Sequence, residues 1–383
     1  MSSSRPRASS PVARERPAAR NGAGRANGRS VAPILVRQIR NGIVESVHRG
    51  DVVEVDLAGR VIRSIGDPER LVSLRSCVKP FGLLALVEAG GVDALDLSPA
   101  ELAIMASSHS GEDIHVRTLQ AVYRRANVSQ TVLACGNVGM PLDALTAARL
   151  ARDGERAGPI RHMCSGQHSS MILLARIKGW PLEDYWRPGH PSQEAYRTAV
   201  AAVFRTTPER LVRAIDGCGV ETYAFSLAEV AGAYAFLADP GGLPAGDPRA
   251  GLARSLTLIR DAMLAHPEMV AGSRERLDTS VMKTVPGRIV SKGGMEALRG
   301  LAILGSGRRA ASGLALKIED GDGHQRATWA ATVEALRQAG ILDGAPLREL
   351  ARYHRPASLD PQGRVVAEAV AEFELAPVGE LIG

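Results

Sequence analysis

The stretch PILVRQIRNGIVESVHRGDVVEVDLAGRVIRS, residues 33–64, decides how the chain begins to fold. Apolar and polar side chains alternate along it, and this period of two is typical of half-buried strands. Asn41-Gly42 and Ala58-Gly59 interrupt the alternation, and Asn-Gly favours the tight turn of a β-hairpin. The stretch therefore predicts two or three antiparallel strands.

The pattern beyond this stretch is helical from about Pro80 to Pro286. Ser98-Pro99-Ala100-Glu101 has the cap, the proline at the first helical position and the acid of a helix start. We expect the other helices near residues 112–126, 141–153, 167–178, 191–205, 208–215, 226–237 and 250–265. The glycine-rich residues 240–252 predict a linker or surface loop.

Strands are predicted again near the C-terminus. They fall at residues 287–291, 301–305, 313–319 and 365–373, with a helix near 325–339 between them. Strands thus come from both ends of the chain and helices from its middle. The fold that buries both is an α/β fold of the α+β type, with one antiparallel sheet flanked by helices.

Charge is unevenly distributed along the 383 residues, which carry a formal net charge of +6. Residues 1–30 hold seven arginines and one glutamate, and seven minus one is +6, so residues 31–383 are neutral overall. The tail has no apolar run, which predicts a disordered basic segment and no secretory signal. We therefore expect a single folded domain over residues 31–383 and no specific nucleic-acid partner.

Two further features indicate the compartment. No segment approaches the roughly 18 continuous apolar residues of a membrane span, which predicts that the protein has no membrane partner. The four cysteines, Cys77, Cys135, Cys164 and Cys218, have no C-x-x-C spacing. Without a signal segment they predict reduced thiols and a cytoplasmic protein.

Ser76-Cys77-Val78-Lys79 is an S-x-x-K tetrad. On one helical turn its amine would lie near its hydroxyl, and a neutral lysine can activate a serine as a nucleophile. Composition alone gives roughly 0.35 such tetrads, and a second one occurs at Ser280 and Lys283. Lysine is scarce, at five residues against 42 arginines, which favours special uses for it; an ordinary salt bridge is the alternative for Lys79.

Four other segments contain chemically active side chains. Ala106–Glu112 clusters small polar groups after a helix, as a site-lining loop or a hydroxyl-rich turn. Ser291-Lys292-Gly293-Gly294 is similar to the K-T-G strand of penicillin-recognising enzymes, and its glycines would allow close approach by a ligand; the alternative is a glycine turn. Cys164–His168 opens a predicted helix and Asp216–Gly219 ends one. Their cysteines are either buried thiols or, with His168 on the same helical face, metal ligands.

Taken together and in order, these segments resemble the asparaginase II family, the third structural class of L-asparaginases. That family is related in fold to serine β-lactamases and S-x-x-K glutaminases. The resemblance runs from about Val31 to the C-terminus. It implies two adjacent Ser–Lys pairs, Ser76 with Lys79 and Ser108 with Lys292, and gives Ser280 and Lys283 no catalytic counterpart. It further implies a substrate site with Arg75, His109 and Asp216, and a homodimer.

The resemblance also implies a zinc ion held by two cysteines and a lysine. The cysteines correspond to Cys164 and Cys218, but the position of the lysine is Gln167. A glutamine amide is a poorer zinc ligand than an amine or imidazole. Three outcomes follow: weak zinc binding with water in place of the lysine, recruitment of His168, or no metal.

The activity implied is hydrolysis of the side-chain amide of L-asparagine to aspartate and ammonia. In this hypothesis Lys79 accepts the proton of Ser76, Ser76 attacks, and Ser108 with Lys292 relays the proton to ammonia. Arg75 or Asp216 holds the charged α-groups of the substrate. Alternatives are a glutaminase, a β-lactamase-like acylase, and a non-catalytic binding protein of the same fold that uses its tail.

Overall fold

The N-terminal strands form where the alternation predicts them. The computed structural model describes residues 31–136, 141–307 and 309–378. β1 spans Ile34–Arg40, β2 spans Ile43–Asp56 and β3 spans Val61–Ile65. Asn41 and Gly42 between β1 and β2 both have positive φ, 44° and 82°, as the two-residue hairpin turn requires. The prediction of two or three antiparallel strands for residues 33–64 is confirmed, and the number is three.

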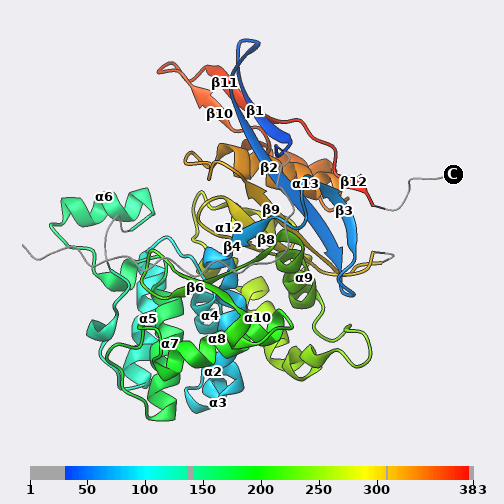
Figure 1. The fold of residues 1–383 in the computed structure, drawn as a ribbon. Coiled ribbons are helices and arrows are strands. Elements are labelled where there is room, and N and C mark those ends of the chain that lie inside the picture. Colours follow the sequence, from blue (N-terminus) through cyan, green and yellow to red (C-terminus); the bar gives the residue numbers. More distant parts are fainter. Residues whose placement is uncertain (1–30, 137–140, 308, 379–383) are drawn as a thin grey trace, which may run out of the picture. The chain divides into compact units, whose positions relative to one another are not determined.

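Strands from both ends of the chain share one antiparallel sheet (Figure 1). Its order is β10-β11-β1-β2-β9-β8-β7, and β3 pairs with β2 and with β12. β2 meets β9 with Val53 opposite Ala315, and β1 meets β11 with Gln38 opposite Ala369. The later strands are β7 Ile289–Gly293, β8 Leu298–Ile303, β9 Ser312–Ile318, β10 Ala357–Leu359, β11 Val365–Ala371 and β12 Ala376–Pro377. The predicted α+β sheet is confirmed.

Helix α9, Leu227–Ala238, lies directly on β8 and β9. Glycines make this close packing possible. A Cβ on Gly313 would stand 1.9 Å from the carbonyl oxygen of Ala231, and one on Gly300 would stand 2.1 Å from the ring of Tyr234. Helix α13, Arg326–Gln338, packs against β1 and β11.

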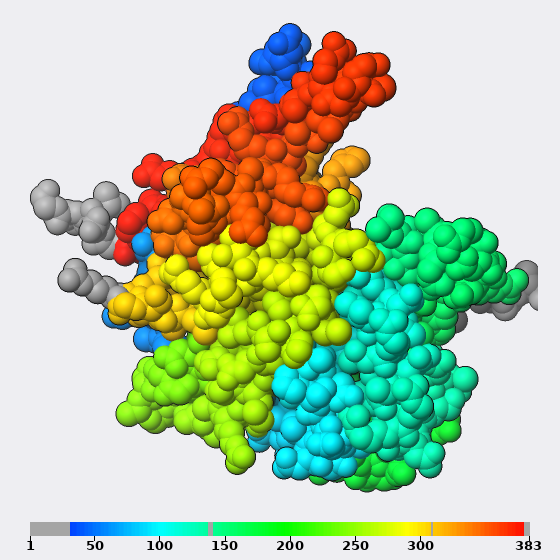
Figure 2. Space-filling view, turned by 180° about the vertical axis from the view of Figure 1, so that it is seen from behind, coloured from blue at the N-terminus to red at the C-terminus, as the bar shows by residue number. Residues whose placement is uncertain are grey.

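The middle of the chain is helical, as predicted. Ser98 caps α4 with a capping box that includes Glu101. Seen from behind, the yellow-green chain of α10 and α11 borders the cyan chain of α4 (Figure 2), which brings residues 106–112 beside residues 270–278. The helices of this region are α1 Lys79–Gly82, α2 Leu84–Glu88, α3 Gly91–Ala94, α4 Pro99–Met105, α5 Asp113–Arg125, α6 Ala144–Arg152, α7 Ser165–Lys178, α8 Pro191–Val203, α10 Ala253–Ala265, α11 Pro267–Val270 and α12 Leu277–Thr284. Two short helices near the C-terminus are α14 Gly344–Glu349 and α15 Ala351–His354.

One predicted helix is wrong. Residues 208–215 form a single 3₁₀ turn, Pro208–Arg210, followed by strand β5, Val212–Ile215. β5 belongs to a second sheet of order β4-β6-β5, with β4 Leu71–Ser73 and β6 Glu221–Ser226. Every residue of β5 is exposed, so the strand lacks the alternation that would identify it. Residues 216–219 therefore close a hairpin and do not end a helix.

Ala32–Gly383 forms one compact unit by its internal contacts. The predicted basic tail, residues 1–30, lies outside the described residues. None of the helices in the part of the chain that the structure describes has the length and apolarity needed to cross a bilayer.

Candidate active site

Ser76 lies at a sharp turn between a strand and a helix. β4 ends at Ser73, and the 3₁₀ turn η1, Arg75–Val78, leads directly into α1. Arg75 has φ of 44°, a left-handed conformation that costs a non-glycine residue of order 1–3 kcal/mol and often marks a functional site. Ser76 Oγ has no hydrogen-bond partner among the described residues, yet it is not among the fully buried atoms without a partner. Its hydroxyl is therefore unengaged and reaches accessible space.

Lys79 is buried and points its amine at the loop after α4. Nζ lies 2.8 Å from Ser107 O, 3.2 Å from Ser108 Oγ and 3.3 Å from Cys164 Sγ. Across the described ranges it makes no hydrogen bond to Ser76. The one-turn spacing therefore brings Lys79 to Ser108 instead of to the serine of its own tetrad.

Ser108 Oγ stands between two lysine amines. Besides Lys79, Lys292 Nζ donates to it at 2.8 Å. Ser108 follows α4, and its backbone N–H donates to Val270 O at 2.9 Å, while Lys292 lies on β7. The fold thus joins three of the predicted residues, Lys79, Ser108 and Lys292, in one chain of hydrogen bonds.

Burial, and after it the nearby charge of Lys79, lowers the pKa of Lys292 from 10.5 to about 7. A lysine with this pKa is available as a neutral base near neutral pH. Asp278 opposes the shift. Its carboxylate accepts from Ser291 Oγ at 2.6 Å, from Gly293 N at 3.1 Å and from Arg299. Although burial raises the pKa of Asp278, the charges of Arg299 and Lys292 bring it down to about 2.

The two glycines after Lys292 make room for the protein's own groups. A Cβ on Gly294 would lie 3.2 Å from the O atom of Leu74, which precedes η1, and 3.2 Å from the Sγ atom of Cys77 within η1. A Cβ on Gly293 would lie 3.0 Å from Arg299 Nη1. The expected close approach is therefore made by η1 and by Arg299, and it seats β7 against the turn that carries Ser76.

Arg75 and Asp216 form an ion pair at the edge of the site. Arg75 Nε and Nη2 donate to the two carboxylate oxygens of Asp216 at 2.9 and 3.2 Å, and this bond raises the pKa of Arg75. Asp216 stands in the turn between β5 and β6. The structure thus brings the two predicted substrate residues together. The Nε and Nη2 donors of Arg75 are already used by Asp216.

His109 is fully buried, and both of its ring nitrogens have protein partners. Nδ1 accepts from Gly111 N at 3.1 Å, so Nε2 carries the proton and donates to Ser165 Oγ at 2.8 Å. The ring stacks on His115 with centroids 4.7 Å apart, and burial lowers its pKa well below 6.5. In this structure His109 fixes the loop that holds Ser108, and the predicted contact of His109 with substrate stays a prediction.

Cys164 and Cys218 are close enough to share a hydrogen bond. That bond, with the charge of Lys79, lowers the pKa of Cys164 well below 9, while the same contact raises the pKa of Cys218. Gln167 Nε2 donates to Tyr196 OH at 2.9 Å. His168 Nδ1 is bonded to Tyr185 OH at 2.5 Å, and its Nε2 is buried without a partner.

These residues fit a zinc ion poorly. Nowhere in residues 31–136, 141–307 or 309–378 do three His, Cys, Asp or Glu side chains gather as a metal site would require. Two thiols are one or two ligands short of the sets that hold zinc in proteins. No catalytic step is therefore assigned to a metal.

The second S-x-x-K tetrad, which runs from Ser280 to Lys283, lies on α12. Ser280 Oγ donates to Tyr353 OH at 3.0 Å, and Lys283 is half exposed with its amine 3.6 Å from Glu268. Ser280 and Lys283 thus have ordinary structural partners.

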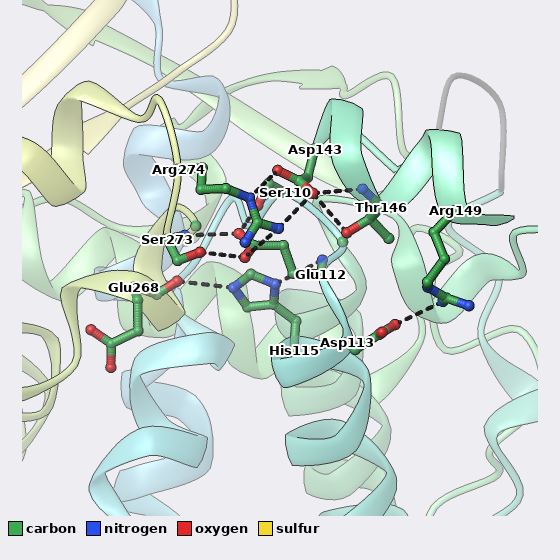
Figure 3. A network of polar contacts seen from close by, with 12 residues as sticks. Ser110, Glu112, Asp113, His115, Asp143, Thr146, Arg149, Glu268, Ser273 and Arg274 are labelled. Carbon is green, nitrogen blue, oxygen red and sulfur yellow. Dashed lines mark hydrogen bonds and ion pairs between the residues drawn. The ribbon is translucent and has the colours of Figure 1, made fainter.

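A polar network that no sequence motif predicts surrounds Glu112 (Figure 3). Glu112 accepts from Ser110 Oγ at 2.6 Å and from Ser273 N at 2.8 Å, and it pairs with Arg274 at 3.1 Å. Arg274 also donates to both oxygens of Asp143, at 3.0 and 2.7 Å. This network ties the loop before α12 to the loop after α4. No motif marks these partners, because they are 131 and 161 residues apart in the chain.

A family model described as L-asparaginase II matches residues 36–371. No curated protein matches the sequence. Among solved structures, a probable glutaminase from Bacillus subtilis complexed with 6-diazo-5-oxo-L-norleucine has 11% identity, 78% coverage of this chain, 87% of its own and a TM-score of 0.37. Mglu in its native form in 4.3 M NaCl has 16% identity, coverages of 82% and 67%, and a TM-score of 0.34. These TM-scores are too low to support an argument. The family match spans most of the chain, so the protein is an amidohydrolase that belongs to the L-asparaginase II family.

Proposed function

We propose that the protein hydrolyses the side-chain amide of L-asparagine with a serine nucleophile. The observation that supports this most directly is the position of Ser108 Oγ between the amines of Lys79 and Lys292. A hydroxyl in that position can accept a proton from one amine and pass its own to the other. The low pKa of Lys292 supplies the acceptor.

Ser76 is the better candidate for the attacking group. An attacking oxygen needs a free lone pair and access to the substrate, and Ser76 Oγ has both, whereas Ser108 Oγ is held by two amines. Catalytic hydrogen bonds are often long before substrate binds, so the missing contact between Ser76 and Lys79 does not exclude their pairing during reaction.

The steps are those of acyl transfer. Ser76 Oγ attacks the amide carbon while its proton passes to Lys79 and, through Ser108, on to Lys292. The carbon–nitrogen bond then breaks, and ammonia leaves with a proton returned along the same path. Water then attacks the acyl-serine ester and gives a proton to the lysines. The ester bond breaks, the lysines return a proton to Ser76 Oγ, and aspartate leaves.

The oxyanion needs backbone donors close to Ser76. The N–H groups of Gly293 and Gly294 are engaged with Asp278 Oδ2 and Leu298 O. Ser76 itself lies in the first turn of η1, where a helix supplies no acceptor for its own N–H groups. The N–H of Ser76 is therefore the donor that we propose.

The test is ammonia release from L-asparagine by wild type and Ser76→Ala, with Ser280→Ala as the matched control. We expect Ser76→Ala to lose nearly all activity and Ser280→Ala to keep it. Ser76→Ala protein that releases ammonia at the wild-type rate would refute Ser76 as the nucleophile. Parallel assays with L-glutamine and a β-lactam decide between asparaginase, glutaminase and acylase, and wild-type inactivity on all three would favour a non-catalytic role.

A further inference from the structure

Arg276 places a guanidinium against the backbone of Ser108. Its Nη2 donates to Ser108 O at 3.0 Å, which is its one side-chain hydrogen bond to the described residues. None of the described carboxylates lies within ion-pair distance of it. An arginine side chain carries five N–H donors, so most of those on Arg276 are unused.

The carboxylates nearest to Arg276 are already paired with other arginines. Asp278 and Glu112 both lie near enough for their charge to act on it. Asp278, however, is bonded to Arg299, and Glu112 is paired with Arg274 at 3.1 Å (Figure 3). Both carboxylates are therefore engaged by other arginines, and Arg276 has no carboxylate partner of its own among the described residues.

The position of this cation is unfavourable unless an anion joins it. Burial lowers the pKa of Arg276, which means that its charge is poorly hydrated. A buried charge is normally paired. The Arg276 side chain nevertheless keeps a partly exposed surface, and none of its nitrogens is among the fully enclosed atoms without a partner. Its free donors thus face space that a ligand can enter.

A carboxylate suits these donors, because a guanidinium binds it through two parallel hydrogen bonds. In asparagine only two carbon atoms separate the side-chain amide carbon from the α-carboxylate carbon. An anchor for that carboxylate must therefore stand beside the reacting serines, where Arg276 stands. Arg75 is less suitable, since Asp216 already fills one edge of its guanidinium.

We propose that Arg276 binds the α-carboxylate of the amino-acid amide and so restricts the enzyme to substrates that carry this group. The proposal rests on the proposed function of the Ser76 and Ser108 site. It leaves the Asp216 carboxylate to face the positive α-amino group.

The experiment compares wild type with Arg276→Gln on two substrates. One is L-asparagine, and the other is 3-aminopropanamide, which is asparagine without its carboxylate. Glutamine keeps a donor for Ser108 O but has no charge. We expect KM for asparagine to rise roughly 10- to 150-fold, the range for a lost charged hydrogen bond, while kcat/KM for 3-aminopropanamide stays the same. Arg352→Gln is the matched control, because Arg352 is exposed and pairs with Glu275 beside Arg276.

Two outcomes overturn the proposal while asparagine hydrolysis stands. An unchanged KM for asparagine in Arg276→Gln shows that the guanidinium does not hold the carboxylate. An equal loss on both substrates shows a structural effect through Ser108. Calorimetric titration of both proteins with L-aspartate is independent of turnover, and weaker binding by Arg276→Gln supports the anchor even where hydrolysis is not detected. Wild type that neither hydrolyses asparagine nor binds aspartate refutes the anchor and the proposed function together.

Discussion

The pH dependence of hydrolysis is the sharpest test of the two-lysine site. With a pKa of about 7, half of Lys292 is neutral at pH 7, against about 0.04% for a lysine of ordinary pKa near 10.4. Burial thus raises the amount of usable base roughly a thousandfold. Lys292 must be neutral to accept a proton, so kcat/KM should rise with pH through 7 and level off above 8. Below pH 6 it should fall about tenfold for each pH unit, to roughly 3% at pH 5.5.

A substitution that removes the amine of Lys292 tests the same base. Lys292→Met has a similar length and no basic group, and we expect a loss of about 10²- to 10⁴-fold in kcat, the usual contribution of a general base. Lys283→Met is the control, because Lys283 is a half-exposed lysine on α12 outside the site. The assay is coupled ammonia detection across pH 5 to 9. A flat profile across pH 6 to 8 in wild type, or a Lys292→Met protein of normal kcat, would refute this assignment of the base.

Three other substitutions test the surroundings of the site. Asp278→Asn removes a negative charge that supports protonated Lys292, so the acid limb of the pH profile should move down by about one unit; a move upward would contradict the assigned electrostatics. Gln167→Lys supplies the amine of the family's zinc set, and competition with a chromophoric chelator should show tighter zinc binding than in wild type, while equal affinities would count against a cysteine-centred site. Gly313→Ala should lower the free energy of unfolding by about 1–3 kcal/mol, because the added Cβ would meet the backbone of α9. Gly323→Ala is its control: Gly323 has open space around it, so this variant should unfold at the wild-type denaturant midpoint.

The sequence predicts the large sheet well because its strands alternate or stand next to glycine turns. It fails at β5, whose side chains are all exposed and whose pairing with β6 depends on tertiary contacts. Strand propensity is weak where no face is buried. The same limit applies to β4, which is only three residues long.

The residues of the site are likewise only partly predictable from the sequence. The motifs predict Ser76, Lys79, Ser108 and Lys292 as site residues. They place Lys79 beside Ser76, whereas in this structure its amine is bonded to Ser108, because rotamer and burial decide where a flexible amine points. Arg276 and Asp278 carry no motif at all. Arg276 matters through its hydrogen bond to Ser108, which lies 168 residues away in the sequence. Asp278 matters through its hydrogen bond to Gly293 on β7, next to Lys292. Spacing along the chain does not reveal such contacts.

The left-handed conformation of Arg75 has a consequence for protein engineering. A glycine would adopt φ of 44° with less strain, so a screen for heat resistance would favour that replacement. The same replacement would remove the ion pair between Arg75 and Asp216. It would also make the turn that contains Ser76 more flexible. We therefore expect selection for stability alone to enrich variants of lower turnover at this position. Turnover should be measured beside melting temperature in any screen for a more heat-resistant enzyme.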